Sequence, residues 1–200
     1  GQPDGWKDLD PERIDHWEIG LSHPVGRRVR ADFSIYRDEV ENALRLVTPP
    51  PPPPRWANIG DYTVDGAEAS LTAYPTRNLD CFLGVSYART SPDDVPHAPE
   101  WTCSGGVEYR PTTRVTLSLN GEYVGDHEVI NTRQQNAAQE DVDDYVLAHA
   151  RATYRVTAPE SDWMTEVFLI ADNITDEEYE YQPGYPMPGT TLTVGVDVKW

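Results

Sequence analysis

Cysteine is scarce in this 200-residue sequence, and long apolar runs are missing from it. Two cysteines, Cys81 and Cys103, are too few for a disulfide framework, and no metal-type spacing surrounds them. No stretch of about 18 apolar residues occurs and the mean hydropathy is −0.62, so a transmembrane helix is excluded. A transmembrane β-barrel is not excluded, because only alternate residues of its strands face lipid.

Basic residues and catalytic motifs are also scarce. The 16 Lys and Arg residues stand against 34 Asp and Glu, and the resulting net charge of −18 argues against nucleic acid as a partner. We interpret the carboxylates as a solvated acidic surface, with acidic loops that hold divalent ions or attract a cationic ligand as the alternative. HExxH, GxSxG and P-loop motifs are absent, so we expect no enzyme, no cofactor and no resident metal ion.

What the sequence has instead is a strict alternation of apolar and polar residues with a period of two. In the final segment, 190–200, one face is wholly apolar and the other polar, as in a strand that separates two media. Similar alternation occurs in eight earlier segments: 14–23, 29–36, 62–74, 79–87, 102–109, 115–123, 145–154 and 163–171. These segments have about ten residues, which suits a tilted strand crossing a bilayer, whereas soluble strands usually have about five or six. The sequence therefore predicts about nine strands and no helix.

The predicted connections alternate between short and long. Short ones fall at 24–26, 75–78, 110–114 and 157–162, and long ones at 37–60, 90–101, 125–144 and 172–189. Bacterial outer-membrane barrels have short periplasmic turns and long extracellular loops. The first long connection contains six consecutive prolines, 49–54, which we interpret as a rigid spacer, with a recognition segment for a proline-binding partner as the alternative.

Aromatic side chains recur where the predicted strands reach the short turns. Four predicted strands end on an aromatic residue that has the parity of the apolar face: Tyr74, Tyr109, Tyr154 and Trp200. Trp163 lies at the same level on a fifth strand. Rings at this depth are typical of a membrane interface. Cys103, within the nucleophile-like stretch 102–106, and Cys81 are both expected on the lipid face, and the sequence leaves open whether they pair.

The side chains on the other face of the predicted strands are too polar for a dry protein interface. They suit a water-filled lumen or contact with a polar plug. The residues expected to face the lumen are Glu68, Glu108, Glu122, His149 and Arg151. Phe168 and Ile170 also fall on this face, and the alternation does not explain them.

The long connections hold the candidate ligand contacts, and we expect Trp56, His127 and Arg133 to contribute to them. The acidic residues between 172 and 180 suggest calcium binding, but they lack the alternation of an EF-hand, so we interpret them as a solvated turn.

Four segments resemble the C-terminal part of TonB-dependent outer-membrane receptors. They are Asp10-Pro11-Glu12-Arg13 before Trp17-Glu18-Ile19-Gly20-Leu21, Asn58-Ile59-Gly60 before Val64-Asp65-Gly66-Ala67-Glu68, Asn173-Ile174-Thr175-Asp176-Glu177-Glu178-Tyr179, and Tyr185-Pro186-Met187-Pro188-Gly189 before the last strand. Thr190 departs from the pattern, because the family commonly has arginine there.

The resemblance implies an all-β, antiparallel transmembrane barrel of 22 strands, closed around an N-terminal plug. Such receptors bind scarce nutrients, ferric siderophores or cobalamin, and the TonB complex drives uptake through contact with the plug. Residues 1–11 would be a loop entering the barrel, and 12–200 its C-terminal part, with long loops extracellular and the C-terminus periplasmic.

Nine strands cannot close alone, because an odd number leaves the two termini on opposite sides and an open edge cannot face lipid. We therefore expect a C-terminal fragment or a subunit completed by another chain, cut at Gly1 and genuine at Trp200. The expected partners are outer-membrane lipid, the remainder of the receptor, the TonB complex through the missing plug, and the barrel-assembly machinery through the terminal strand. Two alternatives stay open: a passive outer-membrane porin, and an acidic secreted β-domain that binds a partner.

Overall fold

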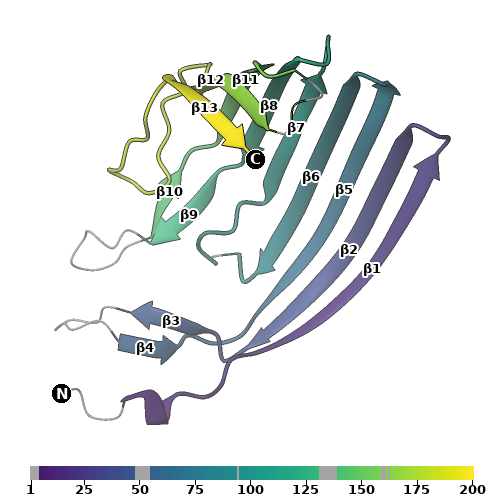
Figure 1. The fold of residues 1–200 in the computed structure, drawn as a ribbon. Coiled ribbons are helices and arrows are strands. Elements are labelled where there is room, and N and C mark those ends of the chain that lie inside the picture. Colours follow the sequence, from purple (N-terminus) through teal and green to yellow (C-terminus); the bar gives the residue numbers. More distant parts are fainter. Residues whose placement is uncertain (1–4, 48–54, 94, 131–138, 159–160, 162) are drawn as a thin grey trace.

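The computed structural model describes the chain except for residues 1–4, 48–54, 94, 131–138, 159–160 and 162. Nine of its strands form one antiparallel sheet, in which every strand pairs with its neighbours in sequence order (Figure 1). These strands are β1 Arg13–Val25, β2 Val29–Glu41, β5 Tyr62–Thr76, β6 Leu79–Ser91, β7 Trp101–Tyr109, β8 Val115–Val124, β11 Tyr145–Arg155, β12 Met164–Asp172 and β13 Thr191–Lys199. The all-β, antiparallel fold of nine long strands predicted from alternation is confirmed.

The sheet is a single curved layer that stays open between β1 and β13 (Figure 1). The short turns lie along one end of the strands and the long connections along the other. The first turn is Gly26–Arg28, where Gly26 has a φ of 72°, so the expected turn at 24–26 was wrong. Pro24 stays in β1 as the partner of Arg30, one residue before the strand ends at the turn.

Two long connections contain short hairpins that alternation did not predict. The first pairs β3 Leu44–Val47 with β4 Arg55–Asn58, and the second pairs β9 His127–Ile130 with β10 Gln139–Val142. The expectation of plain loops there was therefore wrong. A four-residue strand presents only two side chains per face, which is too few for alternation to be recognised in the sequence. A 3-10 helix at Gly5–Asp8 is the one helical element of the described residues, and none of their helices is long or apolar enough to span a membrane.

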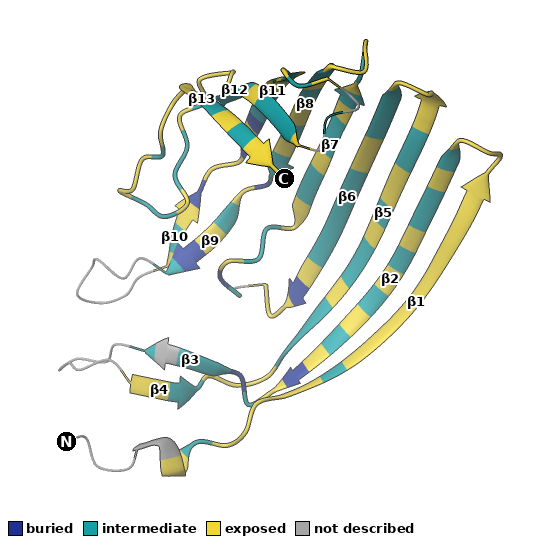
Figure 2. Cartoon of the chain, viewed as in Figure 1, coloured by how far each residue is buried: buried dark blue, intermediate teal, exposed yellow. Residues whose placement is uncertain are grey.

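The apolar face of the sheet is exposed, so no core lies beneath it (Figure 2). On β13, the side chains of Leu192 and Val194 are 70% and 78% exposed, and on β1 that of Ile19 is 74% exposed. The buried hydrophobic residues of the described chain are few and gather near the long connections: Val40, Ala43, Val129, Val142, Tyr145 and Leu147. Such an exposed apolar face marks a surface that another apolar phase must cover.

The register settles the pairing of the two cysteines. Cys81 lies opposite Val107, and Cys103 lies opposite Val85, so the thiols are offset by four residues along adjacent strands. That offset is about 13 Å at the usual rise per residue, beyond the reach of a disulfide. Both cysteines are free and both carry the apolar parity of their strands.

Rings on the polar face lie across glycines of the next strand. Tyr36 is paired with Gly66 and Phe82 with Gly106, and a Cβ added at either glycine would overlap the ring. Phe168 is paired with Gly195 in the same way, and the Arg151 guanidinium lies 4.6 Å from its ring centroid. Phe168, which alternation left unexplained, is therefore a ring held flat between a glycine and a cation.

We expect Gly66→Ala to lower the free energy of unfolding by about 1–3 kcal/mol, because the methyl group must displace the Tyr36 ring or push two paired strands away from each other. Gly84→Ala is the matched control, because a Cβ there meets Ser104 Oγ at an ordinary 3.5 Å. Guanidinium unfolding of the purified protein in detergent measures both. The cost of Gly66→Ala should shrink in a Tyr36→Ser background, and equal stability of the Gly66 and Gly84 variants would contradict the steric account.

Candidate functional site

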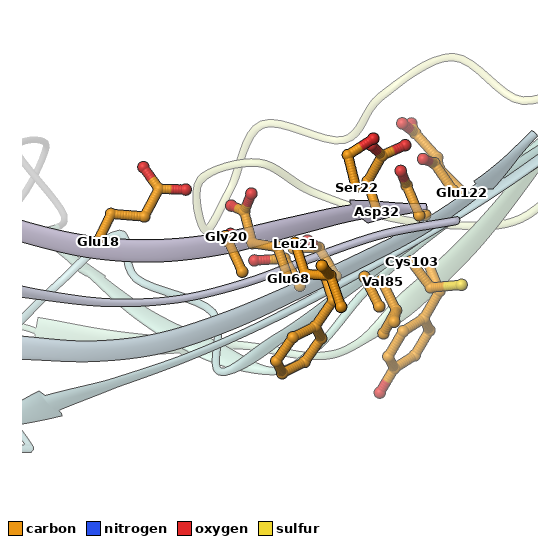
Figure 3. A pocket seen from close by; sticks show the side chains of 18 of the residues that line it. Glu18, Gly20, Leu21, Ser22, Asp32, Glu68, Val85, Cys103 and Glu122 are labelled. Carbon is orange, nitrogen blue, oxygen red and sulfur yellow. The ribbon is translucent and has the colours of Figure 1, made fainter. Parts of the chain in front are cut away.

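A shallow trough of about 740 Å³ lies along the sheet strands β1, β2, β5, β6, β7 and β8. Cross-strand register sets its side chains in rows, and Glu68 of β5 stands between Ser34 of β2 and Ser86 of β6. In the next row, Glu122 of β8 stands beside Ser104 of β7. Figure 3 shows Glu18, Asp32 and Glu122 projecting on one side of the sheet and Cys103 on the other. Residues of the apolar face such as Leu21 and Val85 also border the trough, whereas its polar-face side chains are mainly carboxylates and hydroxyls.

The polar face also carries charged side chains that are paired locally, some beside the short turns and some near the long connections. Arg110, which follows β7, donates to Asp80 Oδ2 at 2.6 Å and also contacts Glu108. His149 Nδ1 and Asp172 Oδ1 are 3.1 Å apart on the neighbouring strands β11 and β12. Arg151 Nε donates to Thr153 Oγ1 at 3.2 Å.

The five residues expected to face the lumen thus share one face, but they do not form one cluster. Glu68 and Glu122 lie in the trough, whereas His149 and Arg151 follow each other along β11. Glu108 and Arg151 share a row but are separated by Ser118 of β8. Among the described residues, no three His, Cys, Asp or Glu side chains are arranged to hold a metal ion. This arrangement supplies a polar, hydrogen-bonding wall.

The ends of the long connections bring basic groups together. His97, in the connection between β6 and β7, donates its backbone N–H to Glu128 O on β9 at 2.7 Å. Burial lowers the pKa of the His97 imidazole below its ordinary value, and the nearby His127 and Arg45 lower it further. The hairpins β3–β4 and β9–β10 therefore flank the same connection, as Figure 1 also shows.

Of the three ligand contacts expected on the long connections, two can be placed. His127 lies in this basic group, with its Nδ1 3.0 Å from Gly125 O. Trp56 is on β4, 58% exposed, one residue from the Arg45–Ala57 pair. Arg133 lies outside the described residues. Sequence reasoning missed His97 and Arg45, because a single His between prolines and a single Arg in an apolar tetrapeptide carry no periodic signal.

The last long connection is organised by Asn173, which is 3% exposed and has a φ of 48°. Its side-chain amide donates to Glu177 O at 2.9 Å and to Pro188 O at 3.2 Å, and its Oδ1 accepts from Glu177 N at 2.9 Å. Thr190 Oγ1 donates to Asn173 O at 2.8 Å, and Thr190 N donates to Asp176 Oδ1 at 2.9 Å. Asp176 is thus an anchor of the connection, in agreement with the interpretation of this acidic stretch as a turn.

A ring cluster closes the same connection over the polar face of β11. Tyr145 lies 4.9 Å from Tyr179 and 6.1 Å from Tyr181, measured between ring centroids. Burial, followed by the hydrogen bond with Tyr181, raises the pKa of the Tyr179 phenol to about 12, so this phenol stays neutral over the physiological pH range. Leu147, 1% exposed, is buried two residues along β11 on the same face as Tyr145.

At the opposite end of the sheet, aromatic side chains stand on the apolar face beside the short turns. Their exposed fractions are 49% for Tyr74, 46% for Tyr109, 45% for Tyr154, 58% for Trp163 and 97% for Trp200. Trp163 precedes Met164 and Trp200 follows Lys199, and these two inner residues are register partners, so the two Trp residues share one level. Their role as a membrane-interface belt stays a prediction.

An open, curved sheet with an apolar outer face and a polar inner face defines the class of protein: it is a section of the wall of a membrane β-barrel. A family model described as "TonB dependent receptor-like, beta-barrel" matches residues 2–174. The chain therefore belongs to the TonB-dependent receptor β-barrel family, as its resemblance to these receptors predicted. The family consists of outer-membrane receptors and transporters.

Solved receptors share the fold at low sequence identity. The ferric-catecholate import receptor Fiu from Escherichia coli K12 is 19% identical, with a TM-score of 0.69, over 94% of this chain and 28% of that one. The copper transporter OprC is 18% identical, with a TM-score of 0.73, over 96% and 32%. The ferric enterobactin receptor PfeA from Pseudomonas aeruginosa is 14% identical, with a TM-score of 0.71, over 95% and 31%. This chain thus spans about a third or less of the length of these receptors.

We expect Asn173→Ala to loosen residues 173–190, because three hydrogen bonds of a buried amide are lost at a cost of about 1–3 kcal/mol. Hydrogen exchange of that connection should become faster, while exchange in β5 and β6 stays unchanged. Glu178→Ala, an exposed change in the same connection, is the control. Unchanged protection in the Asn173 variant would show that the amide does not organise the connection.

Proposed function

We propose that this chain is the C-terminal barrel region of a TonB-dependent receptor that imports a scarce metal complex of the ferric siderophore or cobalamin class. The observation that carries the proposal is the family match over a sheet whose two faces separate apolar from polar side chains. In this role the chain supplies barrel wall and extracellular loops and performs no catalysis.

The open edges of the sheet support completion by a further portion of the receptor. β1 and β13 each have one unpaired side, and both run toward the short-turn end of the strands. Antiparallel closure then requires an odd number of further strands, which a 22-stranded barrel with thirteen more strands satisfies. The plug and the segment that contacts the TonB complex would belong to that portion, and the terminal strand β13 would be read by the barrel-assembly machinery.

We assign the polar trough to the lumen, where a plug would contact it. Glu68 and Glu122 are available for hydrogen bonds to a plug, because the described chain offers no cation to either carboxylate. Glu108, His149 and Arg151 are paired within the wall and would orient its surface.

The long connections are assigned to the extracellular side as the place of ligand contact. Trp56 and His127 lie on two hairpins that flank the basic group with His97 and Arg45, which suits acidic or aromatic ligand groups. Arg133 belongs to the same connection as His127 and is proposed as a further contact.

The assignment of the two faces predicts opposite accessibility for two adjacent residues. In a receptor whose Cys81 and Cys103 are replaced by Ser, a thiol at Glu68→Cys should react with a water-soluble maleimide in intact outer membranes. A thiol at Ala69→Cys, on the apolar face, should be protected from that reagent. Mass-shift labelling measures both, and equal labelling would contradict a lipid-facing outer surface.

Transport itself tests the proposed function. Cells that rely on the complete receptor should grow on a ferric siderophore or take up cobalamin only while the TonB complex is intact. Combined Trp56→Ala and His127→Ala should weaken ligand binding several-fold, whereas Glu178→Gln should not. Uptake that persists without the TonB complex would identify a passive porin, and a chain that remains soluble without detergent would identify a secreted domain.

A further inference from the structure

The two ends of the sheet carry opposite charge. The long connections, 42–61, 92–100, 125–144 and 173–190, together contain fourteen carboxylates and three arginines. The short turns at 26–28, 77–78 and 110–114 contain five arginines and no carboxylate. In a chain with a net charge of −18, this concentration of positive charge at one edge contrasts with the rest of the molecule.

These three turns are joined into one rim by hydrogen bonds between neighbours. Tyr74 N donates to Arg28 O at 2.7 Å and Arg110 N donates to Asn78 O at 2.8 Å, which links the first turn to the second and the second to the third. Arg155 N donates to Arg114 O at 2.8 Å and extends the rim to β11. Figure 1 shows the three tips side by side along the upper edge of the sheet. The arginines therefore have fixed spacing.

Three of the arginines on this rim have free guanidinium groups. Arg110 is engaged by Asp80 and Glu108, and Arg28 Nη1 donates to Pro75 O at 2.5 Å. Arg27, Arg77 and Arg114 are exposed, and within the described residues none of them forms an ion pair or a side-chain hydrogen bond. We call these three residues the basic rim. The fourth turn adds Glu160 and Asp162, which lie outside the described residues.

The aromatic side chains fix the depth of the basic rim. Tyr74 lies three residues before Arg77 of the second turn, and Tyr109 directly precedes the third turn. Both stand on the apolar face with about half of their surface exposed. Amphipathic rings of this kind settle at the level of lipid headgroups. Arginines one to five residues beyond them then lie at the depth of the phosphate groups, and a guanidinium binds phosphate through charge-assisted hydrogen bonds.

We propose that the basic rim, Arg27, Arg77 and Arg114, binds the phosphate groups of anionic phospholipids in the leaflet on the short-turn side. This inference rests on the membrane placement in the proposed function. Positive charge on the rim complements anionic headgroups, and the absence of carboxylates in these three turns leaves that charge uncompensated. The contacts fix the height and tilt of this section of the wall in the bilayer.

Lipid selectivity of the complete receptor tests the proposal. The receptor is reconstituted in phosphatidylcholine vesicles, and the motionally restricted fraction of spin-labelled phosphatidylglycerol is compared with that of spin-labelled phosphatidylcholine. We expect the wild-type receptor to prefer phosphatidylglycerol by about twofold or more, and high salt to weaken that preference. The triple variant Arg27→Gln/Arg77→Gln/Arg114→Gln should lose most of the preference.

The matched control removes three positive charges from the other end of the sheet. Arg13→Gln/Arg55→Gln/Arg89→Gln should keep the preference, because Arg13 and Arg89 are already paired with Asp15 and Asp93. Equal loss in both triples, or no preference in the wild type, would overturn the proposal. Insertion into the bilayer is measured separately by protease protection. A receptor that inserts but shows no lipid preference would refute only the lipid-binding role of the basic rim. A receptor that fails to insert would refute the proposed function.

Discussion

The continuous backbone ladder between strands is the interaction on which this fold depends. A one-layered sheet buries almost nothing between layers, and its buried hydrophobic side chains are confined to the ends near the long connections. In hydrocarbon, an unpaired backbone N–H or C=O costs several kcal/mol, so a ladder without gaps outweighs any single side-chain contact. The same constraint accounts for the exposed apolar face, which lipid rather than protein covers, and for the requirement that the free edges of β1 and β13 be paired.

Once the ladder sets the register, the inner face is built from pairs that satisfy each other across it. Rings lie over glycines at Tyr36–Gly66, Phe82–Gly106 and Phe168–Gly195, and charges meet at Arg110–Asp80 and His149–Asp172. A flat ring over a glycine fills the space that a missing side chain leaves, so the ring packs against the sheet and does not project far from its polar face. In the proposed function, the wall and the ligand contact are therefore separate tasks, and the connections would provide the ligand contact.

The sequence predicted the region of the structure that repeats and missed the region that does not. Alternation over about ten residues identified all nine long strands and both faces, because each strand presents four or five side chains to one medium. Four-residue strands such as β3 and β9 present two per face, too few for a period to be recognised. The role of Asn173 depends on a left-handed backbone and partners up to 17 residues away, and the group around His97 depends on three connections meeting. Such contacts become visible only in three dimensions.

The weak sequence identity to solved receptors follows from the same physics. A chain 19% identical to the receptor Fiu still reaches a TM-score of 0.69 over 94% of its length. What the ladder requires at a wall position is a polarity and a size, not a particular residue, so Val, Leu and Ile are interchangeable on the lipid face. Glycine is the exception where a ring lies across the next strand. The connections obey neither constraint, because their order comes from local hydrogen bonds such as those of Asn173. Their sequences can therefore change without disturbing the wall, which is what a change of ligand would require under the proposed function.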